Sequence, residues 1–417
     1  MSNVSKVQLK DLAVEMYQGI NTVADKVKYY DEGIKILQAK HITKGYIDFS
    51  DARNINPEDY NKYKEKYQPK INDILLSNIG TIGKSILVEE EQQYVIAWNI
   101  FMIRLKESVY ARYINYYFQR LEKINYYEKF MTGNATKFIN KTTMSEIEFL
   151  LPPLKEQQKI ADILSSVDAA IEKTEQVITK TEEVKKRLIQ QLLTKGIRHT
   201  EFKQTEIGEI PVEWSVKRIK DLVSFSGGAQ PPRKEFVFKP REGYIRLIQI
   251  RDYKNDKYTT YIPKELAKKL CDATDIMIGR YGPPIFQILR GIEGAYNVAL
   301  IKAIPDEIYL NKDYLYYFLQ RQDLFNLIDH LSQRSSGQTG IDMEALNNFG
   351  FPLPQLEEQI EIVKIIRNIE NKIHTEKIKY SKLNAVKKGL MQQLLTGKTR
   401  VKETTTYSFL KELGYYE

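Results

Sequence analysis

Side chains that could read DNA bases are concentrated in segments that have the composition of loops. Arginine can pair with guanine, and glutamine or asparagine with adenine, in the major groove, whereas lysine mainly contacts phosphate. Most of these side chains lie among glycine, proline and serine, as in GGAQPPRK, GNATK and QRSSGQTG, which predicts loops. For any one residue, a solvated surface position is at least as good an explanation. As a set, the candidates for DNA contact are Asn78, Asn134, Thr136, Lys137, Gln230, Arg233, Lys234, Arg280, Arg334, Gln338 and Thr339.

No set of residues for catalysis accompanies these candidates. An adenine methyltransferase holds the flipped base with Asn or Asp before Pro-Pro-aromatic; the nearest segment, GPPIF at 282–286, lacks that residue and indicates a turn after a strand. The chain has no GxxxxGK(S/T) phosphate loop, which an ATP-driven motor would need. The four histidines are scattered and Cys271 stands alone, so we expect no metal site, no cofactor and no Cys-His nucleophile. Asp73 and Asp275 could suggest nuclease metal ligands, but their shared place at the start of a strand favours a structural turn.

Composition and charge narrow the class of protein. The chain has 417 residues, of which 42% are hydrophobic and 28% charged, as in globular proteins with two or three cores. Its longest apolar run, Val95 to Ile103, is too short to cross a membrane, and the N-terminus lacks the apolar core of a secretion signal. We therefore expect a cytoplasmic protein without membrane contact. The net charge of +9 fits a polyanionic partner, but the basic residues are spread along the chain, so folding must create any DNA-binding surface.

An internal repeat is the strongest feature of the sequence. FLLPPLKEQQKIADIL, which starts at Phe149, returns as FPLPQLEEQIEIVKII from Phe351, and KKRLIQQLLT from Lys185 returns as KKGLMQQLLT from Lys387. The offset is 202 residues throughout, with 19 identities over 46 aligned positions. A repeat of this length predicts two copies of one structural unit.

Each copy predicts one long amphipathic helix, at 151–197 and at 351–397. Apolar residues recur at three-to-four spacing in both segments, prolines lie at their starts, and Gly196 and Gly397 lie at their ends. A helix of about 40 residues without a local core needs a partner along its length. We expect the two helices to form an antiparallel coiled coil, because the other copy is the most economical partner.

The segments before each helix, 1–150 and 198–350, predict two α+β domains. Short β-branched and aromatic runs between turn residues indicate strands, and the Tyr-rich segments indicate helices. Residues 398–417 form a C-terminal tail. The expected fold is therefore two tandem α+β domains separated by a pair of long antiparallel coiled-coil helices, in a pseudo-two-fold internal repeat. The paired anchors are QLKDL with RIKDL, IKILQ with IRLIQ, DILLSNIG with DIMIGRYG, Trp98-Asn99 with Tyr296-Asn297, and YINYYFQR with YLYYFLQR.

This arrangement resembles the specificity subunit of Type I restriction-modification systems. The resemblance rests on the proline-then-EQ start of each helix, the QQLLT end, the DI(L/M)(L/I)xxxG strand and the EIGEIPVEW segment, and it covers essentially the whole chain. It implies two target-recognition domains that each read half of a bipartite site in double-stranded DNA. It also implies that the chain itself is not an enzyme and that its partners are two adenine methyltransferase subunits and restriction (motor-nuclease) subunits.

The alternative is a coiled-coil scaffold that binds proteins and never touches DNA. Neighbouring genes would separate the two hypotheses, because only a specificity subunit requires a methyltransferase gene beside it. Neither the DNA target nor its spacer length follows from the sequence, since loop side chains need a docked position before they imply bases.

Overall fold

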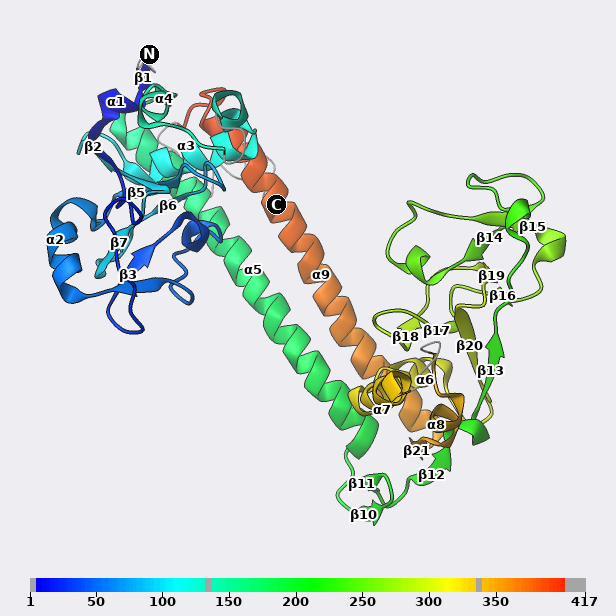
Figure 1. Ribbon diagram of the computed structural model, residues 1–417. Helices are drawn as coiled ribbons and strands as arrows, with labels where there is room; N and C mark the ends of the chain where they lie inside the picture. The colour runs from blue at the N-terminus through cyan, green and yellow to red at the C-terminus, as the bar shows by residue number, and fades with distance from the viewer. Residues whose placement is uncertain (1–4, 132–136, 335–339, 402–417) are drawn as a thin grey trace. The chain divides into compact units, whose positions relative to one another are not determined.

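The structure, a computed structural model, describes residues 5–131, 137–334 and 340–401. Residue contacts divide the chain into two compact units, unit 1 with Met1–Gln176 and Lys377–Glu417, and unit 2 with Val177–Glu376. Two long helices, α5 (Leu154–Lys195) and α9 (Leu356–Leu394), each begin in one unit and end in the other. Each unit thus holds one α+β domain and one half of each long helix (Figure 1). The expected fold class is confirmed.

Unit 1 contains a mixed domain built on two small sheets. One sheet has the order β2-β8-β5-β6 and is antiparallel, the other has the order β4-β3-β7 with β3 and β7 parallel, and β1 pairs with β9. Its elements before α5 are β1 (Ser5–Gln8), α1 (Leu9–Leu12), β2 (Ala13–Gln18), β3 (Ile34–Leu37), η1 (Ala39–Ile42), β4 (Arg53–Ile55), α2 (Pro57–Tyr67), β5 (Ile74–Ser77), β6 (Ser85–Leu87), β7 (Tyr94–Ile96), β8 (Ile100–Leu105), α3 (Ala111–Lys123), η2 (Tyr126–Phe130), α4 (Lys141–Ser145) and β9 (Glu148–Leu151).

Unit 2 repeats this plan and adds the hairpin β10-β11 at its start. Its sheets have the orders β13-β20-β17-β18 and β15-β14-β19-β16, and β12 pairs with β21. Its elements between α5 and α9 are β10 (Phe202–Thr205), β11 (Gly208–Pro211), β12 (Ser215–Arg218), η3 (Ile219–Asp221), β13 (Val223–Gly227), η4 (Arg233–Glu235), β14 (Tyr244–Ile248), η5 (Ile250–Tyr253), β15 (Tyr261–Pro263), η6 (Lys264–Leu266), β16 (Leu270–Cys271), β17 (Ile276–Gly279), β18 (Gln287–Leu289), β19 (Gly294–Tyr296), β20 (Leu300–Pro305), α6 (Lys312–Leu319), α7 (Gln322–Arg334), α8 (Met343–Asn348) and β21 (Gly350–Leu353).

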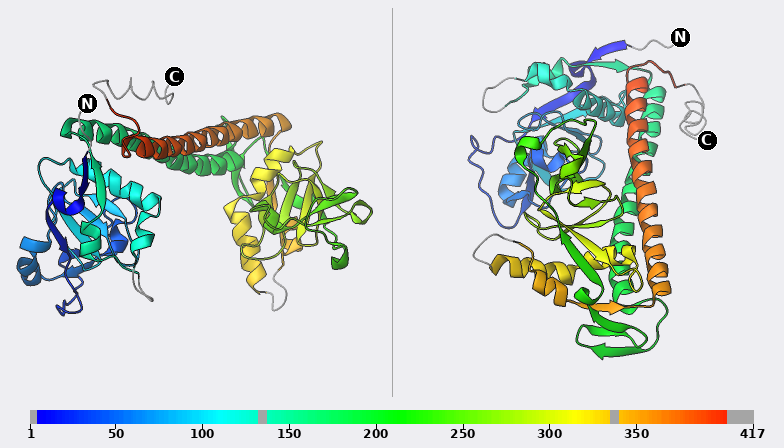
Figure 2. Two further views of the ribbon diagram at one scale, coloured as in Figure 1. Left: turned by 90° about the horizontal axis from the view of Figure 1, so that it is seen from above. Right: turned by 90° about the vertical axis from the view of Figure 1, so that its right-hand side faces the viewer.

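The long helices have 42 and 39 residues and lie side by side (Figure 2). In unit 1 the start of α5 packs on the end of α9, where Ile160 and Leu164 share a core with Leu390 and Leu394. In unit 2 the end of α5 packs on the start of α9 through the cluster Leu192, Leu193, Ile362 and Ile366. Each pairing is therefore antiparallel, as the repeat predicts.

The glutamine of the Glu-Gln pair has the same structural role at the start of both long helices, which explains why both copies of the repeat carry it. In unit 1, Gln157 Nε2 donates to Pro152 O at 2.8 Å, and its Oε1 accepts from Tyr110 N at 2.9 Å. In unit 2, Gln359 makes the same two contacts with Pro354 O at 3.0 Å and Asn311 N at 2.8 Å. One buried amide thus joins the helix start to the segment before α3 or α6.

Backbone contacts confirm most of the paired anchors and correct one. Gln8 pairs with Glu148 and Arg218 with Gly350 in equivalent registers. The Trp98-Asn99 pairing with Tyr296-Asn297 is wrong by two positions. Both turns are closed by one hydrogen bond, from Ile100 N to Ala97 O in unit 1 and from Leu300 N to Asn297 O in unit 2, each at 3.0 Å, so Ala97 corresponds to Asn297. Asn99 and Asn297 therefore occupy different positions of the two turns.

Candidate nucleic-acid interface

In unit 2, two of the segments with candidate side chains meet at one turn, residues 297–300. Gly228 N donates to Leu300 O at 3.0 Å and Ala229 N donates to Tyr296 O at 3.1 Å. From the other side, Arg280 N donates to Ala299 O at 2.8 Å. A Cβ on Gly228 would collide with the carbonyl of Asn297, so glycine is required for this close approach. The fold therefore places the Gly-Pro loop next to Arg280, although about 50 residues separate them in the sequence.

Three side chains of the Gly-Pro loop point into solvent. Gln230 and Arg233 are exposed, and the Lys234 side chain is 81% exposed, with its Nζ 3.9 Å from Glu235 Oε1. Arg280 is half-buried, and its guanidinium lies 5.3 Å from the ring centre of Tyr281. The result is a polar and cationic surface, suited to phosphate and guanine contacts.

Unit 1 builds the equivalent site around the turn at 97–100. Gly19 N donates to Ile100 O at 3.0 Å, Trp98 N to Ile20 O at 2.8 Å, and Asn78 N to Asn99 O at 3.2 Å. The segment that carries Lys137 joins here, because Gly80 N donates to Lys137 O at 3.2 Å. Lys137 is exposed, so it can contact phosphate from this surface.

Asn78 does not fit the contact expected of it. Its side chain is 1% exposed, and its Nδ2 donates to Ile139 O at 3.4 Å. A side chain at this depth supports the loop rather than meeting a ligand. Strand pattern alone could not separate Asn78 from Arg280, because both follow a buried strand at the same place in the repeat.

Five other candidates cannot be placed. Asn134, Thr136, Gln338 and Thr339 lie outside the described residues, and Arg334 lies at the end of α7 with its side chain also outside the description. Their contact with DNA stays a prediction.

Sequence reasoning missed three aromatic residues that the structure exposes, Trp98 at the unit 1 turn and two tyrosines next to arginines. Trp98 is 45% exposed at the unit 1 turn. Arg53 lies 4.6 Å from the ring centre of Tyr29, and Arg251 lies 6.0 Å from that of Tyr258, which is 58% exposed. Arginine and aromatic rings together can stack on bases and bind phosphate. The sequence signal for the two tyrosines was an adjacent lysine, Lys28 or Lys257, whereas Trp98 has no basic neighbour in the sequence.

Two other features have structural roles. Tyrosines and lysines alternate along α2, and Tyr60 and Tyr63 pack inward with less than one tenth of each exposed, so α2 is an amphipathic helix. Asp73 Oδ2 accepts from Lys70 N at 2.7 Å, and Asp275 Oδ2 accepts from Asp272 N at 3.0 Å. The two aspartates therefore close equivalent turns, as predicted.

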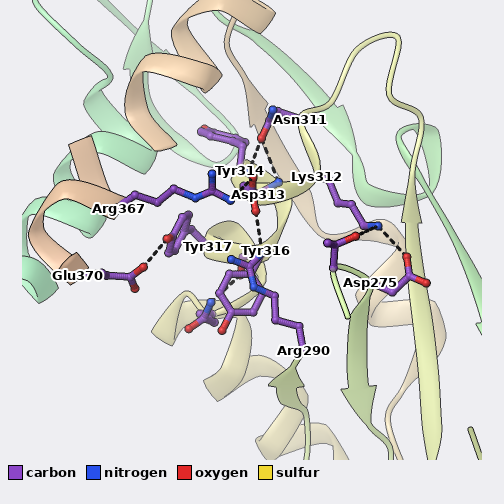
Figure 3. A network of polar contacts seen from close by, with 12 residues as sticks. Asp275, Arg290, Asn311, Lys312, Asp313, Tyr314, Tyr316, Tyr317, Arg367 and Glu370 are labelled. Atoms are coloured by element: carbon purple, nitrogen blue, oxygen red, sulfur yellow. Dashed lines mark hydrogen bonds and ion pairs between the residues drawn. The ribbon is translucent and has the colours of Figure 1, made fainter. Parts of the chain in front are cut away.

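Several charged pairs lie around α6 (Figure 3). Lys312 Nζ lies 2.7 Å from Asp275 Oδ1, and Asp313 accepts from Arg290 and Arg367, at 2.7 Å each. Burial raises the pKa of the Cys271 thiol to about 11, so it stays protonated and is a poor nucleophile. Within the described ranges, no group of three or more His, Cys, Asp or Glu side chains is placed to hold a metal ion.

Comparisons with known proteins support DNA specificity rather than a scaffold. The family model described as "Type I restriction modification DNA specificity domain" matches residues 1–183 and 211–385. The type I restriction enzyme MjaVIII specificity subunit of Methanocaldococcus jannaschii is 26% identical over 418 residues, covering 91% of this chain and 92% of that protein. The EcoKI specificity subunit of Escherichia coli K12 is 20% identical over 370 residues, covering 81% of this chain and 76% of its own length.

A solved structure shows the same fold. The Type I restriction-modification S subunit from M. genitalium aligns with a TM-score of 0.57 at 13% identity, covering 97% of each chain. No helix among the described residues is long and apolar enough to span a membrane. With one specificity-domain match on each half of the repeat, this chain belongs to the family of Type I restriction-modification DNA specificity subunits.

Proposed function

We propose that each domain reads one half of a bipartite DNA site and that the paired helices set the distance between the halves. The observation that carries this proposal is the repeat of one loop arrangement, around the turns 97–100 and 297–300, with different side chains on it. Two-fold axes relate the antiparallel strands of duplex DNA, so two similar readers on one chain suit a split target. Unequal loops then read unequal half-sites.

We further propose that the chain is the non-catalytic member of a complex with two adenine methyltransferase subunits and restriction (motor-nuclease) subunits. Support comes from the absence of methyltransferase and phosphate-loop motifs in the sequence. We also propose that the complex acts in the cytoplasm, where its DNA target would lie. The purified chain should transfer no methyl group without its partners. Methylation that depends on the methyl donor but on no other subunit would contradict this role.

Exchange of residues 1–150 for the matching domain of a relative tests whether each domain reads one half-site. Mapping methylated adenines for the hybrid complex should show one altered half-site and one unchanged half-site. The matched control exchanges residues 198–350 and should alter the other half. A change in both halves after a single exchange would show that recognition is not separable at these boundaries.

Deletion of one heptad from each long helix tests whether the paired helices act as a ruler, that is, whether their length sets the distance between the half-sites. Removing 172–178 and 374–380 shortens each helix by roughly 10 Å, or about three base pairs, while keeping the apolar seam in register. The mapped half-sites should approach and keep their identities. A four-residue deletion is the control, because it rotates the seam and should impair assembly instead. A folded, active heptad deletion with the original spacer would refute the ruler.

A further inference from the structure

A carboxylate on α5 joins three helices within unit 1. Tyr116 of α3 donates its hydroxyl to Asp168 Oδ2 at 2.8 Å, and Lys387 of α9 pairs with Asp168 Oδ1 at 2.6 Å. Tyr116 is 4% exposed and Lys387 14%, and the Lys387 ammonium lies 5.6 Å from the Tyr116 ring centre. One side chain therefore links the domain helix to both long helices.

Unit 2 makes the same link with the long helices exchanged. Tyr317 of α6 donates to Glu370 Oε2 at 2.6 Å (Figure 3), and Lys185 of α5 pairs with Glu370 Oε1 at 2.7 Å. The carboxylates and the lysines are each 202 residues apart, the offset of the repeat, and the tyrosines are 201 apart. The two sets are therefore equivalent, and we call them the Tyr-acid-Lys triads.

Two other polar contacts of α3 and α6 are not shared between the units. Tyr113 donates to Leu150 O at 2.7 Å, but the hydroxyl of its counterpart Tyr314 has no hydrogen-bond partner among the described residues. Arg112 pairs with Glu89 in unit 1, whereas at the corresponding position Asp313 pairs with arginines, so the charge is reversed. The triads persist while their surroundings diverge, which points to a role that both units need.

The chemistry of the triad suits a fixed attachment. The apolar contacts between a domain and the long helices are non-directional and allow small rotations, whereas hydrogen bonds to a carboxylate are short and directional. Burial, followed by the nearby carboxylate, raises the pKa of both Tyr116 and Tyr317, so each phenol remains a donor at any physiological pH. Such bonds restrict the rotation of α3 or α6 against the long helix that carries the carboxylate.

We propose that the two Tyr-acid-Lys triads are positioning devices that hold each recognition domain at one angle on the helix pair and so restrict the spacer length that the complex accepts. The proposal rests on the bipartite reading proposed above. It assigns Tyr116, Asp168 and Lys387 in unit 1, and Tyr317, Glu370 and Lys185 in unit 2, to spacing rather than to base identity.

The test uses the full chain in complex with its methyltransferase partners. The DNA library carries the mapped half-sites with the native spacer and with spacers one or two base pairs longer or shorter. The double variant Tyr116→Phe/Tyr317→Phe removes two hydroxyls and leaves the rings in place. We expect its share of methylation at non-native spacers to rise about tenfold, as loss of a charge-assisted hydrogen bond allows, with half-site identity unchanged.

Tyr113→Phe is the matched control. It removes a buried hydroxyl one turn away on the same helix, but the lost bond ends on Leu150 inside the recognition domain. It should lower the melting temperature and leave the spacer distribution as in the wild type. If the double variant also keeps the wild-type spacer distribution, the triads are merely structural and the proposal is overturned.

A second pair of variants keeps the test decisive if the tyrosine variants fail to fold. Lys185→Met/Lys387→Met leaves the phenol-carboxylate bonds and frees only the second long helix, so the rise at non-native spacers should be smaller, about threefold. An unchanged distribution in these variants would also overturn the proposal. If the wild-type complex itself ignores spacer length, the bipartite reading fails instead.

Discussion

Unit 1 and unit 2 share contacts that attach a domain to the long helices, and they differ in the side chains that their loops present. Gln157 and Gln359 close the helix starts in the same way, and the Tyr-acid-Lys triads are equivalent. In contrast, Asn78 is buried where Arg280 is half-exposed. The same attachment is therefore kept in both copies while the loop side chains differ, as the proposed recognition of two different half-sites requires.

The units also differ in how each Glu of the Glu-Gln pair is used. In unit 2, Glu358 accepts from Ile197 N at 2.9 Å and from Trp214 Nε1 at 2.8 Å, and lies 2.9 Å from His199 Nε2. In unit 1, Glu156 instead accepts from Arg400, at 2.8 and 2.6 Å, and from Val401 N. Trp214 is 1% exposed, whereas the Arg400 side chain is 37% exposed, so the glutamate accepts from a buried indole in unit 2 and from a partly exposed arginine in unit 1.

The largest expected effect follows from this contrast. Glu358→Ala leaves the buried Trp214 indole N–H and a backbone N–H without acceptors. It should lower the free energy of unfolding of unit 2 by about 3 kcal/mol. Glu156→Ala is the matched control and should cost about 1 kcal/mol, because its main partner can be solvated. Chemical denaturation of both variants measures this. Equal losses would remove the contrast between the units.

The second prediction separates binding from stability at one position of the repeat. Arg280→Gln should weaken binding of the mapped duplex about tenfold, as for loss of an arginine contact, with little change in stability. Asn78→Ala should instead lower the free energy of unfolding by about 1–2 kcal/mol and leave DNA affinity unchanged. Fluorescence anisotropy of the assembled complex and thermal denaturation give the two readouts. A loss of affinity for Asn78→Ala in folded protein would contradict its supporting role.

The third prediction compares two buried phenols. Tyr113→Phe breaks a hydrogen bond to Leu150 O and should cost about 1 kcal/mol. Tyr314→Phe removes a buried hydroxyl without a partner among the described residues, and should be neutral or stabilising by up to about 1 kcal/mol. Melting temperatures of the two variants would show which variant is the less stable. A larger loss of stability for Tyr314→Phe would mean that the Tyr314 hydroxyl is hydrogen-bonded.

The smallest effect is a dependence on pH in unit 1. The hydrogen bond from Arg400 holds the pKa of Glu156 below its ordinary value of 4.5. Because the folded pKa is the lower one, the contribution to stability is complete above about pH 4.5 and is lost as the pH falls through the folded pKa. Arg400→Gln should cost less than about 1 kcal/mol at pH 7. This cost should vanish in acid, where Glu156 is protonated. Denaturation curves of the wild type and of Arg400→Gln that still differ at low pH would contradict the prediction.

Much of this architecture was determined by the sequence alone. The 202-residue repeat, the apolar spacing and the prolines and glycines at the ends predicted two long helices, which the structure shows as α5 and α9. Helical periodicity is a local property, so it can be read residue by residue. The turns of Asp73 and Asp275 followed for the same reason.

Only the tertiary structure decided which loops meet and which side chains face outward. The Gly-Pro loop reaches Arg280 through backbone bonds to the turn at 297–300, and Asn78 is buried at 1% exposure while Trp98 is exposed at 45%. The triads likewise join residues up to 271 positions apart, from Tyr116 to Lys387. Exposure and such contacts depend on how distant segments pack, and no local pattern of residue types carries that information.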